Sequence, residues 1–229
     1  MHNITLICTT HKGICKCNSM ELYDIIERAN PEVIFEELPP CFFDEYYKDM
    51  TKDNLETNTI KLYLSNHDIK HIPVDLDVIM PQSFWDENEY MFEQIERKNS
   101  KFCRLCDDDS QYTRQYGFNY LNSIYCNNIN KDKYMEMEKT LKILNDKKLL
   151  EIYETWNNIH EKRENEMMIN IYNYCKENIF DKGLFFIGAA HRESIIAKIK
   201  KYNENETELL NIKWNYLDYD NYNAQLIDV

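Results

Sequence analysis

Glycine and proline are scarce in this sequence, which has 4 Gly and 5 Pro among 229 residues. Because these residue types interrupt helices and mark turns, their scarcity favours long helices joined by short connections. The sequence also lacks a glycine-rich phosphate loop and a G-x-S-x-G nucleophile elbow. Their absence argues against the usual mode of nucleotide binding and against the usual serine-hydrolase layout.

Positive charge is also in short supply, since 27 Lys and Arg face 40 Asp and Glu, for a formal net charge of −13. A nucleic-acid backbone or an anionic membrane would need a basic surface, so we expect neither as a partner. No run approaches the roughly 20 apolar residues of a membrane span. The N-terminus also lacks the basic and apolar parts of a secretory signal. We therefore expect a cytoplasmic protein.

The 8 cysteines form no regular disulfide framework and are expected to be free thiols. Cys103 and Cys106 have the spacing of half a zinc site. No second C-x-x-C supplies the other two ligands that a structural zinc needs. The cysteines therefore do not point to a metal site.

Short apolar runs alternate with helical patterns in the first third of the chain. The expected strands are 4–10, 33–38 and 72–77, and the expected helices begin after Asn18 and cover about 55–66. Strand–helix–strand order with short connections is typical of a parallel sheet.

The strand pattern disappears from about Pro81 to Asn178, where we expect several helices, the clearest from Lys147 to about Asn178. A strand at 184–189, a helix at 193–202 and a strand near 211–219 follow. We predict a single α/β domain over residues 1–229. It has a largely parallel central sheet with flanking helices, and a long all-helical insertion or cap (81–178) before the last core strands.

Two strands at opposite ends of the chain each end in small residues and a histidine: Thr9-Thr10-His11 follows Ile4–Cys8, and Gly188-Ala189-Ala190-His191 follows Leu184–Ile187. In open α/β sheets, ligands bind at the carboxyl edge of the strands. We therefore expect His11 and His191 to meet in one crevice, as metal ligands or as a general base. The other four histidines lack this setting and are expected to be structural: His2, His67, His71 and His160.

Acidic residues also end predicted strands. Glu36 and Glu37 face opposite sides of the sheet, so at most one of them can face a given site. Asp75 and Asp77 would share a face and could orient a histidine, or they are simply turn residues. Arg163 would share a helix face with apolar residues, where it must meet a carboxylate, a carbonyl or a substrate anion. Composition alone favours a solvated helix surface instead.

In this order the motifs resemble the TraB/PrgY/GumN family, within a superfamily that includes Tiki proteases, haem-binding ChaN proteins and erythromycin esterases. The matching segments are Cys8-Thr9-Thr10-His11, Glu37-Leu38, Pro73–Asp77, Arg163–Met167 and Gly188–His191. The chain departs from the family pattern at Cys8, where Gly is usual, at Lys162, where Glu is usual, and at Glu164, where Asp is usual.

The resemblance implies a divalent-metal hydrolase acting on a peptide, amide or ester. His11 and His191 would bind Mn, Co or Zn, and Glu37 would be a third ligand or the base for the metal-bound water. Arg163 would stabilise the oxyanion and Asp75 would orient a histidine. The expected partner is a peptide or small-molecule substrate.

Two other functions fit the same residues. One is a non-catalytic module that binds haem, a small ligand or a peptide. The other is a metal-independent esterase in which one histidine is the general base. The sequence leaves the substrate, the metal and the oligomeric state open. Of the two adjacent glutamates, the E-L motif favours Glu37 over Glu36 as the site residue.

Overall fold

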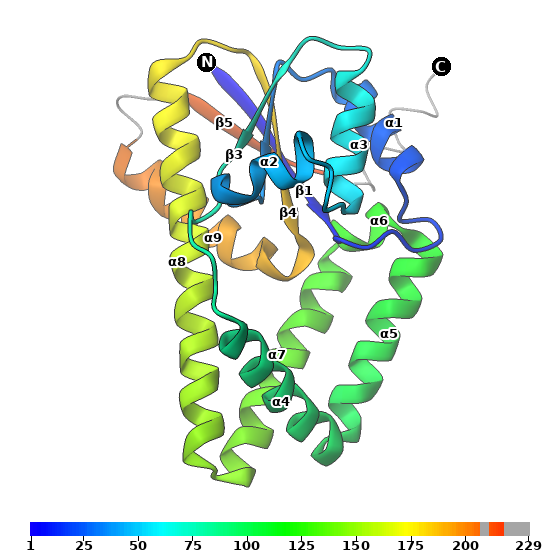
Figure 1. Ribbon diagram of the computed structural model, residues 1–229, viewed down its shortest axis with the longest axis vertical. Helices are drawn as coiled ribbons and strands as arrows, with labels where there is room; N and C mark the ends of the chain where they lie inside the picture. The colour runs from blue at the N-terminus through cyan, green and yellow to red at the C-terminus, as the bar shows by residue number, and fades with distance from the viewer. Residues whose placement is uncertain (207–210, 218–229) are drawn as a thin grey trace.

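Five parallel strands form the central sheet of the computed structural model, which describes residues 1–206 and 211–217 (Figure 1). They are β1 (His2–Thr9), β2 (Val33–Glu36), β3 (Lys70–Pro73), β4 (Lys182–Gly188) and β5 (Ile212–Tyr216). Their order is β3-β2-β4-β1-β5, and every pair is parallel. The predicted α/β fold with a parallel sheet is confirmed.

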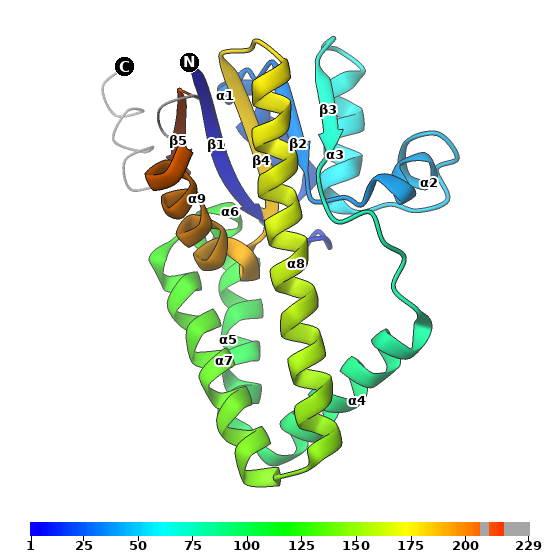
Figure 2. The ribbon, with the colours of Figure 1, turned by 90° about the vertical axis from the view of Figure 1, so that its left-hand side faces the viewer.

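Helices cover both faces of this sheet, with α8 and α9 on one face and α1 and α3 on the other (Figure 2). Before the helical segment come α1 (Ser19–Ala29), the 3₁₀ turn η1 (Pro40–Phe42), α2 (Phe43–Tyr47) and α3 (Leu55–Leu64). After β4 come the 3₁₀ turn η2 (Ala189–His191) and α9 (Arg192–Glu206). Asn18 caps α1 as expected, because its Oδ1 accepts hydrogen bonds from the Met20 and Glu21 backbone N–H groups.

The predicted all-helical segment is present between β3 and β4. It consists of α4 (Gln82–Lys98), α5 (Ser100–Tyr116), α6 (Phe118–Leu121), α7 (Ile124–Leu144) and α8 (Lys147–Glu177). Most of these helices extend beyond the carboxyl edge of the sheet (Figure 1). They pack around a hydrophobic cluster of their own, which includes Met91, Ile95, Leu141 and Ile152.

The third strand differs from its prediction. It covers 70–73 rather than 72–77, because the chain turns after Pro73. The Asp75 carboxylate accepts a hydrogen bond from the Leu76 backbone N–H at 2.7 Å, a local bond that favours a turn over a strand. Asp77 instead accepts a hydrogen bond from the Cys41 N–H. The expected shared face of Asp75 and Asp77 is therefore wrong.

The end of β1 is held by a side chain from the helical segment. Asn122 is buried, accepts a hydrogen bond from the Cys8 N–H at 2.8 Å and donates one to the Cys8 carbonyl at 3.0 Å. β1 and β4 are direct neighbours with Cys8 opposite Ile187. The two strand ends that carry His11 and His191 therefore lie side by side, as the sequence predicted.

The last strand ends at Tyr216, and Tyr219 of the predicted range 211–219 lies outside the described residues. Within 1–206 and 211–217, no helix combines the length and the apolar character that crossing a membrane would require.

Candidate active site

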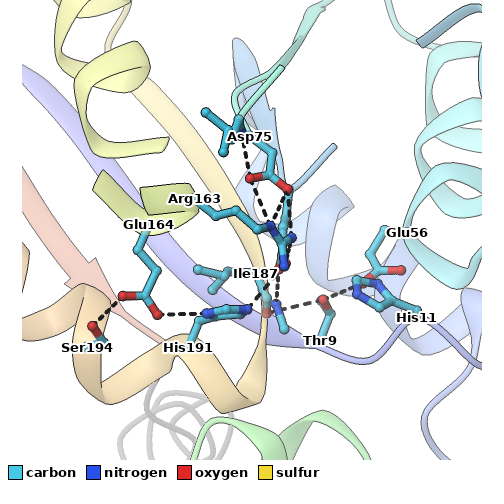
Figure 3. A network of polar contacts seen from close by, with 12 residues as sticks. Thr9, His11, Glu56, Asp75, Arg163, Glu164, Ile187, His191 and Ser194 are labelled. Carbon is cyan, nitrogen blue, oxygen red and sulfur yellow. Dashed lines mark hydrogen bonds and ion pairs between the residues drawn. The ribbon is translucent and has the colours of Figure 1, made fainter. Parts of the chain in front are cut away.

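Arg163 of α8 is the centre of a cluster of ion pairs at the carboxyl edge of the sheet (Figure 3). Its Nη2 donates to Glu37 Oε1 at 2.6 Å and to Asp75 Oδ2 at 2.7 Å, and its Nε donates to Asp75 Oδ2 at 3.0 Å. The side chain of Glu37 is 5 % exposed and that of Asp75 is fully buried. Of the alternatives left open for Arg163, the structure shows contact with two carboxylates, and Asp75 partners this arginine rather than a histidine.

His191 is buried beside the same cluster. Its Nδ1 lies 2.7 Å from Glu164 Oε1, and its Nε2 lies 3.5 Å from Glu37 Oε1. Ser194 donates its hydroxyl hydrogen to the other oxygen of Glu164. Because a carboxylate can only accept, Nδ1 carries the proton toward Glu164 and the Nε2 edge faces Glu37.

His11 forms a second histidine–glutamate pair on the other side of Glu37. Its Nδ1 donates to Glu56 Oε1 at 3.1 Å, and Thr9 donates its hydroxyl hydrogen to the same oxygen at 2.7 Å. The Glu56 side chain is 6 % exposed, whereas the His11 side chain is 57 % exposed. Glu56 thus fixes the orientation of a ring whose other nitrogen is open to ligand.

The charges of this cluster determine its protonation. Burial alone would raise the pKa of Glu37, but the His191 and Arg163 cations outweigh it and lower this pKa to about 2. Burial opposes protonation of His191, but Glu37 and Glu164 outweigh it and raise the pKa of His191. The hydrogen bond to Glu56 raises the pKa of His11 to about 9. Glu37 is therefore ionised at neutral pH, and His11 is mostly protonated.

Glu37 is the site residue of the pair, because Glu37 contacts Arg163 whereas Glu36 contacts Tyr47. Glu36 Oε2 accepts a hydrogen bond from the Tyr47 hydroxyl at 2.6 Å, and the buried Glu36 Oε1 has no hydrogen bond. The carboxyl group is buried, and this burial raises its pKa to about 8. Glu36 therefore carries a proton in the folded protein at neutral pH.

We expect Glu36→Gln to favour stability more at pH 9 than at pH 4.5, by up to about 5 kcal/mol between the two pH values. The folded state holds a proton on Glu36 that the unfolded chain releases near pH 4.5, so wild-type stability falls as pH rises from 4.5 to about 8. Glutamine keeps the acceptor for Tyr47 and does not ionise. Urea unfolding at pH 4.5 and pH 9 measures the difference, with Glu45→Gln on the exposed side of α2 as the control. A gain of equal size at both pH values would contradict a buried, protonated Glu36.

A cavity of about 500 Å³ opens onto the site. His11, Glu37, Asp75 and Arg163 line one end of it. His160, one helical turn before Arg163, also lines this cavity and stacks on His191 with ring centroids 5.0 Å apart. Burial and the neighbouring His191 lower the pKa of His160 to about 4, so its imidazole is neutral at pH 7.

The hydrogen bonds that Glu37 already makes argue against the predicted metal ion. Glu37 Oε1 accepts from Arg163, and its Oε2 accepts from the Gly188 backbone N–H at 2.6 Å. Over the described ranges, no group of three or more His, Cys, Asp or Glu side chains is arranged to hold a metal. The positive charge opposite Glu37 comes from Arg163 and the two histidines. The metal site of His11, His191 and Glu37 stays a prediction.

Three residues of this site were not among the sequence candidates: Glu56, Glu164 and His160. Glu164 follows Arg163 directly, at the position where the resembled family has Asp, and this was the available signal for it. His160 shares a helix face with Arg163, three residues away, which a helical projection of α8 would have revealed. Glu56 lies in the first turn of α3 and carries no signal in the sequence.

Comparison with protein-family models, with curated proteins and with solved structures found no match. The resemblance to the TraB/PrgY/GumN family therefore stays a prediction, and the function is argued from the geometry of the site.

Proposed function

We propose that this protein is a hydrolase that cleaves an ester or amide bond with His11 as the general base, without a metal ion. One observation carries the proposal. The exposed His11 ring faces a cavity and is held through Nδ1 by the buried Glu56. This is the arrangement in which a carboxylate sets the tautomer of a catalytic histidine and stabilises its protonated form.

In the proposed reaction, neutral His11 accepts a proton at Nε2 from a water molecule in the cavity. The water oxygen attacks the carbonyl carbon, and the carbonyl π electrons move to the carbonyl oxygen. When the tetrahedral intermediate collapses, the bond to the leaving group breaks and the leaving group takes the proton from His11. The products are a carboxylic acid and an alcohol or amine, and His11 returns to its neutral state.

Arg163 supports the developing negative charge in this scheme. Its hydrogen bonds to the described residues use Nε and Nη2, which leaves Nη1 for an oxyanion. Burial would lower the pKa of Arg163, but Glu37 and Asp75 raise it, so the guanidinium stays charged. Two carboxylates fix its orientation, and fixed charges of this kind lower reaction barriers most effectively.

We expect the rate to rise with pH until His11 is deprotonated, with a midpoint at about pH 9. Only about 1 % of His11 is neutral at pH 7 when its pKa is about 9. Glu56→Gln removes the carboxylate that raises this pKa, so the midpoint should move down toward the ordinary histidine value of 6.5. Hydrolysis of p-nitrophenyl acetate from pH 5.5 to 10, corrected for the spontaneous reaction, measures both midpoints.

Glu45→Gln is the control for this experiment, because Glu45 forms an exposed ion pair with Lys52 and does not contact His11. Its midpoint should equal that of the wild type. If the Glu56→Gln midpoint also stays at the wild-type value, His11 is not the base.

A metal-dependent form of the same hydrolase is the second proposal. It is favoured by one observation, the position of the Glu37 carboxylate 3.5 Å from His191 Nε2 in a cluster that also includes His11. Elemental analysis of untagged protein, beside a folded His11→Ala/His191→Ala double variant, distinguishes the two forms. Near-stoichiometric Mn, Co or Zn in the wild type alone would favour the metal-dependent enzyme.

A binding module is the third alternative. It would bind haem, a small ligand or a peptide at the same cavity without turnover. Saturable binding together with no hydrolysis of esters, amides or peptides at any pH from 5.5 to 10 would favour it over both hydrolases.

A further inference from the structure

The cavity at the site has two chemically different parts. His11, Glu37 and Arg163 are among its polar lining residues, and large apolar side chains form much of the rest of its wall. These apolar residues include Phe42, Met80, Phe84, Trp85 and Trp156. A volume of about 500 Å³ is in the range of cavities that bind small molecules rather than macromolecules.

We infer that the substrate carries an aromatic ring beside the bond that is cleaved, and that Trp85 is the residue that selects for this ring. The inference rests on the proposed hydrolase function and names its substrate class.

Trp85 is singled out by its exposure. It lies in the first turns of α4, and its side chain is among the exposed large apolar groups, at 55 %. Its recorded ring contact is with the neighbouring Phe84, at a centroid distance of 5.1 Å. The indole face is therefore available to a ligand, and aromatic rings add an interaction beyond the area that they bury.

Trp156, by contrast, already has protein partners. Its ring lies within 6.1 Å of the rings of Phe92, Tyr134, Tyr153 and His160. These contacts hold it in the wall beside His160. The Trp156 ring is thus packed against other side chains of the protein, whereas much of the Trp85 ring is exposed.

A second cavity of about 440 Å³ is also lined by His160, and most of its other lining residues are polar. Asn127, Asn130, Lys131 and Asn157 are among the residues that line it. An aromatic ring would leave these amides and the ammonium group without partners, which is costly in a partly enclosed space. The aromatic group of a substrate at His11 is therefore expected on the Trp85 side.

Hydrolysis of two methyl esters tests the inference. Methyl 3-phenylpropanoate carries the ring and methyl propanoate lacks it, and a pH-stat measures the acid released from each. We expect the wild type to prefer the phenyl ester in kcat/KM. Trp85→Ala should lower the ratio of the two kcat/KM values by about tenfold. Trp85→Phe should keep most of the preference, and Trp85→Leu should keep less.

Tyr90→Ala is the matched control, because Tyr90 is an exposed aromatic residue on the same helix and does not line the cavity. Its ratio should equal that of the wild type. An unchanged ratio in Trp85→Ala, or a wild-type enzyme that hydrolyses both esters equally well, would overturn the inference and leave the hydrolase proposal intact.

Binding of 4-phenyl-2-butanone separates this inference from the proposed reaction. This ketone has the phenyl group and the carbonyl but no bond that water can cleave, and calorimetry measures its binding. Binding that weakens in Trp85→Ala, with no ester or amide hydrolysed, would support the aromatic ligand class and contradict the hydrolase. Failure of the ketone to bind to the wild type would overturn the aromatic inference.

Discussion

Replacing His11 with alanine should lower the rate of ester hydrolysis by about 10²–10⁴-fold at pH 9, the contribution usual for a general base. The loss follows from the loss of Nε2, because the attacking water would have no group to accept its proton. His11 is 57 % exposed, so most of its ring makes no packing contacts that the fold would lose. Glu56 keeps its hydrogen bond from Thr9. Initial rates measured with p-nitrophenyl acetate, together with thermal unfolding, would separate catalysis from folding.

The matched control for this variant is His67→Ala. His67 is also partly exposed and also lies near a glutamate, with Nε2 3.5 Å from Glu27, but it does not line the cavity. Its rate should be that of the wild type. A folded His11→Ala variant that retains the wild-type rate at pH 9 would contradict the proposed role of His11.

Replacing Arg163 with methionine should destabilise the protein by about 3–5 kcal/mol at pH 7.5, the usual cost of removing one partner from a buried ion pair. Asp75 would then be a buried carboxylate without a counter-ion, and Glu37 would keep the histidines but lose Arg163. Burial already raises the pKa of Asp75 above that of the unfolded chain, and loss of the arginine would raise it further. The stability of the variant therefore rises relative to that of the wild type as pH falls. The difference in the free energy of unfolding between the two proteins should be smaller at pH 5. Urea unfolding at the two pH values measures it.

Arg97→Met is the control, because Arg97 pairs with Glu93 on the exposed surface of α4. An exposed pair contributes little, so this variant should lose less than about 1 kcal/mol. Adding Asp75→Asn to Arg163→Met should recover part of the stability, since it removes one unpaired charge. Equal losses for Arg163→Met and Arg97→Met would contradict a buried charge cluster.

The sheet and the facing strand ends could be predicted from the sequence because their signals are local. Apolar runs ending in small residues mark β1 and β4, and alternation with helical patterns marks a parallel sheet. β3 was predicted to begin two residues and to end four residues too late, because Val74 and Leu76 extend the apolar pattern past the turn at Asp75. Apolar periodicity does not detect a side chain that accepts a hydrogen bond from the backbone of the next residue.

The site could be predicted only in part. His11, His191, Glu37, Asp75 and Arg163 are together in space, and this much follows from strand ends and one helix face. Which of these side chains contact each other could not be deduced, because that depends on how α3 and α8 are positioned along the edge of the sheet. That position decides that Glu56 meets His11 and that Asp75 meets Arg163.

The adjacency of β1 and β4 has a consequence for how the purified protein should be judged. Their residues are about 180 positions apart in the chain, as in the pairing of Asn3 with Lys182. Contacts of such long range form late in folding, whereas α4, α5, α7 and α8 share a hydrophobic cluster of mostly nearer neighbours. A preparation in which the chain ends have not paired would keep most of its helical circular dichroism signal and have no site. Helix content therefore does not report whether β1 and β4 have paired, and ligand binding at the cavity is the more direct measure.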